Sequence, residues 1–211
     1  MQRNLLLIFL LLLPGLVLAQ KMKRPKLSAR KLSCTIRPIT NQYRANEPVI
    51  LRIKIQNMAD SAITLVNAPE GADLSQRYPH ATFYVSKVAG SSEEIRKAPP
   101  KTGSITRIGP GDFIRLAPGE SFDPLAKAAS FPASLPLTFP VLPAGVYDIS
   151  FQYSTLADDL PDWLSNVDWY DDLAGTIMVS RRKEYDAIVP LLSRVPRVVL
   201  SSNTVRVTVV P

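Results

Sequence analysis

Hydrophobic and polar side chains alternate along several short stretches of this chain. The two clearest are residues 48–57, with Val49, Leu51, Ile53 and Ile55 in the hydrophobic positions, and residues 146–153, with Tyr147, Ile149, Phe151 and Tyr153 in theirs. Because side chains point to alternate faces of a β-strand, each stretch predicts a strand with one buried and one solvated face. Strands of this kind are typical of antiparallel sheets.

Weaker alternation, with turns rich in proline and glycine, predicts more strands at residues 32–39, 62–66, 81–88, 113–116 and 203–210. The best helical pattern covers residues 182–192 but contains Pro190, which disfavours a helix interior. Many short strands without a sustained helical period indicate an all-β fold, an antiparallel β-sandwich. We expect long proline-rich loops at 98–111 and 118–143 and an inserted segment at about 155–200, before the last strand.

The first nineteen residues contain a long hydrophobic run. Arg3 precedes a leucine-rich stretch that is interrupted by Pro14-Gly15, and small residues lead to a cleavage point before Gln20. This pattern is typical of a signal peptide. Because a membrane-spanning helix needs about 20 apolar residues, we favour cleavage over retention as an anchor. We therefore expect an exported protein, either periplasmic or secreted.

Removal of residues 1–19 leaves about 190 residues, which suits one domain. We expect a basic N-terminal arm at residues 20–31 and a single domain at residues 32–211. Cys34 is the only cysteine, so no disulfide within the chain can form. An exported fold without disulfides depends on its core, which fits a bacterial compartment. We expect Cys34 to be a buried, small apolar residue.

The net charge of +7 is concentrated near the N-terminus. Eight basic residues lie between the predicted signal peptide and the first acidic residue, Glu47: Lys21, Lys23, Arg24, Lys26, Arg30, Lys31, Arg37 and Arg44. One interpretation is an arm that touches an anionic membrane or cell-wall surface, and the other is a solvated linker. Export and the lack of interleaved aromatic residues argue against nucleic acid as a partner.

Several turn motifs occur in a recognisable order. They are Asn-Glu-Pro-Val at 46–49, Leu-Ala-Pro-Gly-Glu-Ser at 116–121, Leu-Pro-Ala-Gly-Val-Tyr at 142–147 and Ser-Asn-Thr-Val-Arg-Val-Thr-Val at 202–209. This order resembles exported bacterial immunoglobulin-like β-sandwich proteins of uncharacterised type, and it is also similar to the domain of BsuPI-type proteinase inhibitors. The resemblance extends over roughly residues 45–210 and implies an immunoglobulin-like fold, but it transfers no binding residues.

Four residues of these motifs have predicted structural roles in three turns. Pro118-Gly119 suits a type II turn, in which glycine takes a positive φ. Gly145 is expected to supply a permissive backbone at a corner. Tyr147 is expected to fold back onto an upstream backbone group, as in the tyrosine corner of immunoglobulin-like domains.

Residues 156–175 combine carboxylates with aromatic side chains and contain no basic residue. The candidate ligand-binding residues are Asp158, Asp159, Asp162, Trp163, Asp168, Trp169, Tyr170, Asp171 and Asp172. They could stack on sugars and bind their hydroxyls, anchor a protein partner, or hold Ca²⁺ through carboxylate oxygens. The structural alternative is a long connection in which the tryptophans cover the core and the aspartates are solvated.

Enzymatic chemistry has little support in this sequence. His80 is the only histidine, so any histidine-dependent nucleophile would have to use it, and we expect it at the start of a strand. One histidine and one cysteine disfavour a zinc site, and no phosphate-binding or dinucleotide motif occurs. We assign no catalytic residue and no cofactor; Ca²⁺ is the one metal that the acidic segment leaves open.

The sequence therefore indicates an exported, non-enzymatic binding or envelope-associated module with a protein or glycan partner in the envelope. Two alternatives stay open. A proteinase-inhibitor-like protein would present a rigid loop from residues 98–111 or 122–140 to a protease. A carbohydrate- or Ca²⁺-binding module would use residues 158–172.

Overall fold

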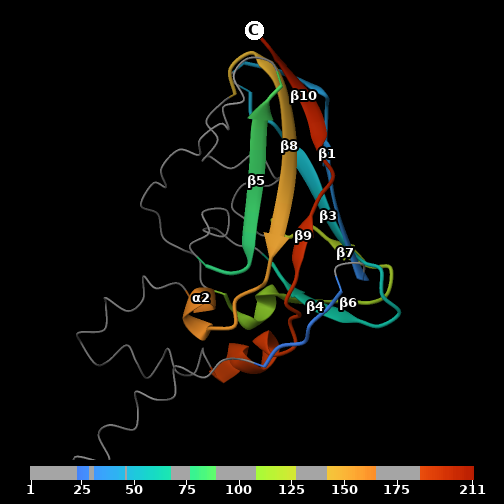
Figure 1. The fold of residues 1–211 in the computed structure, drawn as a ribbon, viewed down its shortest axis with the longest axis vertical. Coiled ribbons are helices and arrows are strands. Elements are labelled where there is room, and N and C mark those ends of the chain that lie inside the picture. Colours follow the sequence, from blue (N-terminus) through green and yellow to red (C-terminus); the bar gives the residue numbers. More distant parts are fainter. Residues whose placement is uncertain are drawn as a thin grey trace, which may run out of the picture.

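A computed structural model describes seven parts of the chain: residues 23–28, 31–45, 47–67, 77–88, 108–126, 142–164 and 186–211. These parts are built mostly from β-strands, as the alternation of side chains predicted. The long strands β5 (His80–Lys87) and β8 (Gly145–Ser154) run side by side in opposite directions along the molecule, in front of β1 (Leu32–Pro38) and β3 (Leu51–Asn57) (Figure 1).

One sheet has three strands in the order β1-β3-β7, where β7 is Ser121–Phe122, and both pairings are antiparallel. A second antiparallel pair, β4 (Ile63–Val66) with β6 (Phe113–Leu116), follows β3 and precedes β7 along the chain. The predicted strands at 62–66 and 113–116 are thereby confirmed and pair with each other.

The other sheet has the order β2-β10-β8-β5, where β2 is Gln42–Arg44 and β10 is Val205–Val210. A further short strand, β9 (Val199–Ser201), pairs with the end of β8 that β10 does not reach. The pairing of β2 with β10 is parallel, so the expectation of purely antiparallel sheets is wrong at this point. The cause is that the chain leaves β1 at Pro38 and crosses to the C-terminal strand of the other sheet.

The two sheets turn their hydrophobic faces toward a common core. Alternation in β3 buries Leu51, Ile53 and Ile55 and exposes Arg52 and Lys54, as expected. The residues that the other sheet contributes to the same core include Phe83, Val85, Tyr147, Ile149, Phe151, Tyr153, Val207 and Val209. Each large apolar side chain buried in this way stabilises the fold by about 1.5–3 kcal/mol.

Two of the three turn predictions are confirmed. The Tyr147 hydroxyl donates to the Pro143 carbonyl at 2.7 Å. Gly119 has φ of +81°, and the Glu120 N–H donates to the Ala117 carbonyl at 3.1 Å across the turn. Both contacts are local in sequence, which is why short motifs could predict them.

The third turn prediction, for Gly145, has a different physical basis. Gly145 has no positive φ and begins strand β8. A Cβ atom at this position would lie 2.8 Å from Cε of Lys87 and 3.3 Å from the Tyr147 hydroxyl oxygen. A side chain here would displace the flexible end of Lys87, so glycine leaves room for two neighbouring side chains rather than supplying backbone freedom.

A second, smaller hydrophobic cluster lies at one end of the molecule, beneath β5 and β8 in Figure 1. We call this end, formed by residues 155–164 and 186–197, the helical pole. It contains the short helix α2 (Leu160–Leu164) and the helical residues 186–192. The described part of the predicted helix at 182–192 is thus helical, with Ile188 and Leu192 buried in the cluster. Among the described helices, none is long and apolar enough to cross a membrane.

Candidate functional site

The acidic and aromatic segment begins at the helical pole. Asp158 and Asp159 precede α2, and Asp162 and Trp163 lie within it. The other candidate residues, Asp168, Trp169, Tyr170, Asp171 and Asp172, lie outside the described residues. The structure therefore brings together four of the nine candidates.

Trp163 is a core residue of the helical pole. Its side chain is 0% exposed, and its indole N–H donates to the Ala157 carbonyl at 3.1 Å. The ring of Tyr78 lies 5.7 Å away, centroid to centroid. A ring enclosed in this way has no face open to a ligand from solvent. For Trp163, the structure therefore agrees with the structural alternative, in which the tryptophans cover the core.

The three described aspartates have different surroundings. Asp158 forms an ion pair with Arg197, with 3.0 Å between its Oδ2 and Nη1 of the arginine. Asp159 and Asp162 are exposed. Over the described ranges, no three His, Cys, Asp or Glu side chains lie close enough to share a metal ion. The Ca²⁺ hypothesis thus depends on Asp168, Asp171 and Asp172, and it stays a prediction.

Part of the basic N-terminal arm packs against the helical pole. Arg24 is only 7% exposed, and its guanidinium donates to three backbone carbonyls, those of Val195 at 3.0 Å, Pro196 at 3.2 Å and Ala157. Its Cζ atom lies 4.7 Å from the centroid of the Trp163 ring. This arginine is therefore held by the domain and is not available to a membrane or cell-wall surface.

Burial lowers the pKa of Arg24 to about 10, although the nearby carboxylate of Asp158 opposes this shift. Arg24 consequently keeps its charge at neutral pH, and the three carbonyls and the aromatic face compensate for the lost water. Sequence reasoning missed this contact. Its partners are backbone carbonyls more than 130 positions away, and no residue pattern encodes such partners.

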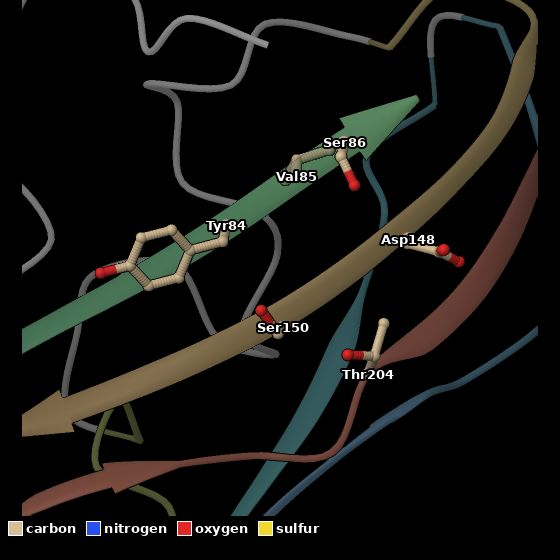
Figure 2. Close-up of a pocket in the computed structure, with 6 residues that line it drawn as sticks. All are labelled: Tyr84, Val85, Ser86, Asp148, Ser150 and Thr204. Carbon is tan, nitrogen blue, oxygen red and sulfur yellow. The ribbon is translucent and has the colours of Figure 1, made fainter. Parts of the chain in front are cut away.

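The outer face of the five-stranded sheet contains a shallow depression of about 420 Å³ (Figure 2). Tyr84 and Ser86 project from β5, Asp148 and Ser150 from β8, and Thr204 from the segment before β10. The four side chains on β5 and β8 alternate with the core residues of the same strands, so they point away from the core. The depression is accordingly lined by four hydroxyls, one carboxylate and the apolar Val85, and the Tyr84 ring adds further apolar surface.

Two polar groups of this face, those of Tyr84 and Asp148, make contacts with neighbouring side chains. Tyr84 is 44% exposed, and its hydroxyl lies 3.3 Å from Oε1 of Gln152. Arg206 forms a two-point ion pair with Asp148, at 2.8 Å and 2.9 Å, and these hydrogen bonds lower the pKa of that carboxyl. Sequence reasoning treated these strand positions only as a solvated face. The available signal was Tyr84, an aromatic residue on the polar side of an alternating strand.

The only cysteine and the only histidine occupy structural positions. Cys34 is buried, as expected, and burial raises the pKa of its thiol to about 12. A thiol with this pKa is protonated at neutral pH and is a weak nucleophile. His80 begins strand β5, as expected, and its ring stacks on Tyr78 with 3.8 Å between centroids.

The loops proposed for protease inhibition are described only in part. Residues 98–107 and 127–140 lie outside the described residues. Residues 110–112 form a 3₁₀ turn, η3 (Pro110–Asp112), whose Asp112 carboxylate accepts from the Gly109 N–H at 2.9 Å. The inhibitor hypothesis therefore stays a prediction.

Comparison with known proteins gives no relative for this chain. No protein-family model matches it, and neither a curated protein nor a solved structure does. Function must therefore be argued from the surfaces themselves.

Proposed function

We propose that this chain is an exported, non-enzymatic binding module with an immunoglobulin-like β-sandwich fold. We further propose that it binds a glycan of the cell envelope on the outer face of β5, β8 and β10. The observation that carries this proposal is Tyr84, which stands exposed beside a depression lined by hydroxyls and a carboxylate.

The order of the strands supports the immunoglobulin-like fold. If β1, β3, β5, β7, β8 and β10 are lettered A, B, C, E, F and G, the two sheets have the orders A-B-E and G-F-C. Immunoglobulin domains divide their strands between sheets in this way. Tyr147 lies near the start of the strand lettered F, and its hydroxyl bonds an upstream carbonyl, as the tyrosine corner requires.

The chemistry of the depression favours a glycan over a protein. A protein-binding hot spot is a packed pocket that an apolar anchor fills and desolvates. This depression instead offers four hydroxyls that can both donate and accept, while both oxygens of its one carboxylate already accept from Arg206. A sugar presents many hydroxyls to such groups, and the Tyr84 ring adds an apolar surface with a polar tip.

The signal-peptide pattern at residues 1–19 supports a ligand that lies in the cell envelope. Residues 1–19 have the pattern of a signal peptide, so the folded domain would meet the polymers of the envelope rather than those of the cytoplasm. Envelope polysaccharides, cell-wall oligosaccharides and lipopolysaccharide are the glycans to examine.

The proposal is tested by titrating the mature protein with defined oligosaccharides from these three sources in a calorimeter. Tyr84→Ala removes the ring and its hydroxyl and should weaken binding at least tenfold, which corresponds to about 1.4 kcal/mol. Tyr84→Phe keeps the ring and separates stacking from hydrogen bonding. Lys54→Ala, on the outward face of β3, is the matched surface control and should bind as the wild type does.

Two results would contradict the proposal. One is the absence of binding across all three classes of oligosaccharide. The other is binding that Tyr84→Ala and Lys54→Ala leave equally strong, because the ligand would then sit elsewhere on the molecule.

A further inference from the structure

The helical pole contains a site that fits a guanidinium group. Three backbone carbonyls, those of Ala157, Val195 and Pro196, converge on the Arg24 side chain, and each nitrogen of its guanidinium donates to one of them. The ring of Trp163 lies 4.7 Å from the guanidinium carbon. We call the three carbonyls and this ring the guanidinium socket.

The body of the domain holds the socket together. The Trp163 indole N–H donates to the same Ala157 carbonyl that accepts from Arg24, which fixes the ring and that acceptor relative to each other. The Thr155 hydroxyl donates to the Pro196 carbonyl, a second acceptor of the socket, at 2.6 Å. Two of the three acceptors are thus positioned by residues outside the arm.

The geometry selects a guanidinium over an ammonium. A planar guanidinium directs its N–H groups outward in one plane and can stack on an aromatic ring, whereas an ammonium is a compact, strongly hydrated point charge. The socket uses all three nitrogens of Arg24 and its flat face. A lysine at this position would place a single nitrogen among three separate acceptors.

The segment that carries Arg24 also contacts the body of the domain through its backbone. Lys26 forms a parallel β-bridge with Arg197, and the Arg197 N–H donates to the Pro25 carbonyl at 2.9 Å. Lys23 and Lys26 are exposed, and Leu27 is half-buried against the main core. Arg24 is the one buried residue among residues 23–28.

We propose that the guanidinium socket is a binding site in its own right and that Arg24 is its intramolecular ligand. The chemical class of ligand is an alkylguanidinium, the side chain of an arginine in an extended segment. Residues 23–28 are then a strap whose one buried side chain fills the socket, and the socket accepts another guanidinium when Arg24 is removed. This inference is independent of the glycan site, which lies on the outer face of the sheet.

Chemical rescue tests the socket directly. In the full mature chain, Arg24→Ala empties the socket and should lower the melting temperature by several degrees. Ethylguanidinium at millimolar concentration, far below denaturing levels, should restore at least half of the loss with a saturating dose response. Ethylammonium at the same ionic strength should restore little. Arg194→Ala removes an exposed arginine of the same pole and should respond to neither compound.

Rescue that fails to saturate, or that ethylammonium matches, would overturn the proposal. Arg24→Gln keeps hydrogen-bond donors and goes through the same titration, because Arg24→Ala can fail to fold. If both variants are unfolded, their refolding yield is compared in the two compounds. A higher yield in ethylguanidinium alone supports the socket, and equal yields reject it.

Discussion

The side-chain amide of Asn203 pairs with both backbone polar groups of Ile36. Its Oδ1 accepts from the Ile36 N–H at 2.9 Å, and its Nδ2 donates to the Ile36 carbonyl at 3.2 Å. Asn203 lies between β9 and β10 in one sheet, and Ile36 lies in β1 of the other. A side chain thus takes the place of a neighbouring strand and joins the two sheets at this edge.

Asn203→Ala should lower the free energy of unfolding by about 2 kcal/mol, because it leaves two backbone groups of a buried residue without their partner. Urea denaturation followed by far-UV circular dichroism measures the change. Asn203→Asp keeps the acceptor and loses the donor, so its loss should be smaller. An alanine variant as stable as the wild type would show that water replaces the amide.

Tyr153→Phe should destabilise the protein more than Tyr147→Phe. The buried hydroxyl of Tyr153 donates to the Val66 carbonyl at 2.6 Å and accepts from the Val66 N–H at 3.1 Å. That of Tyr147 makes one hydrogen bond within the described parts of the chain, to the Pro143 carbonyl. We expect losses of about 2 and about 1 kcal/mol in the same denaturation assay. Equal losses would mean that one of the two Val66 contacts contributes nothing.

The buried thiol of Cys34 should make the free energy of unfolding decrease in alkaline solution. Burial raises the pKa of its thiol from 9.0 to about 12, so the unfolded chain releases this proton at lower pH than the folded protein does. The stability linked to the neutral thiol is complete below pH 9 and is lost as the pH rises toward 12. Between about pH 8 and about pH 10.5, the wild type should lose about 2 kcal/mol more than Cys34→Ala.

Denaturation at the two pH values measures this difference. Thr35→Ala, at an exposed position of the same strand, should keep the wild-type dependence on pH. If the wild type and Cys34→Ala lose the same free energy of unfolding between the two pH values, the thiol ionises as easily in the folded protein as in the unfolded chain.

The leader should be removed on export. Expression of the full chain in a bacterial host, followed by intact mass measurement of the exported protein, should give a chain that begins at Gln20. The short apolar run with its Pro14-Gly15 break is the reason to expect cleavage rather than anchoring. A chain that keeps residues 1–19 and stays with the membrane fraction would contradict this expectation.

The sequence predicted those features of the fold that arise from local contacts. Alternation identified β3 and β8 because every second residue of each is buried, and the motif around Tyr147 predicted a hydrogen bond that spans only four residues. The parallel strand β2 could not be predicted, because three residues are too few to show a period.

The candidate sites were harder to predict for a related reason. The sequence directed attention to Trp163, whose ring the structure buries, and to five residues that lie outside the described parts. The depression beside Tyr84 gathers side chains from three separate segments, and the Arg24 site consists mainly of backbone carbonyls. Neither arrangement leaves a contiguous motif in the chain.

The most direct test of glycan binding is chemical-shift mapping of the ¹⁵N-labelled mature protein during titration with envelope oligosaccharides. We predict shifts that concentrate in residues 82–86, 148–152 and 204, around the depression, with the helical pole unchanged. Shifts confined to the helical pole, or no shifts with any of the three classes of oligosaccharide, would contradict the proposal.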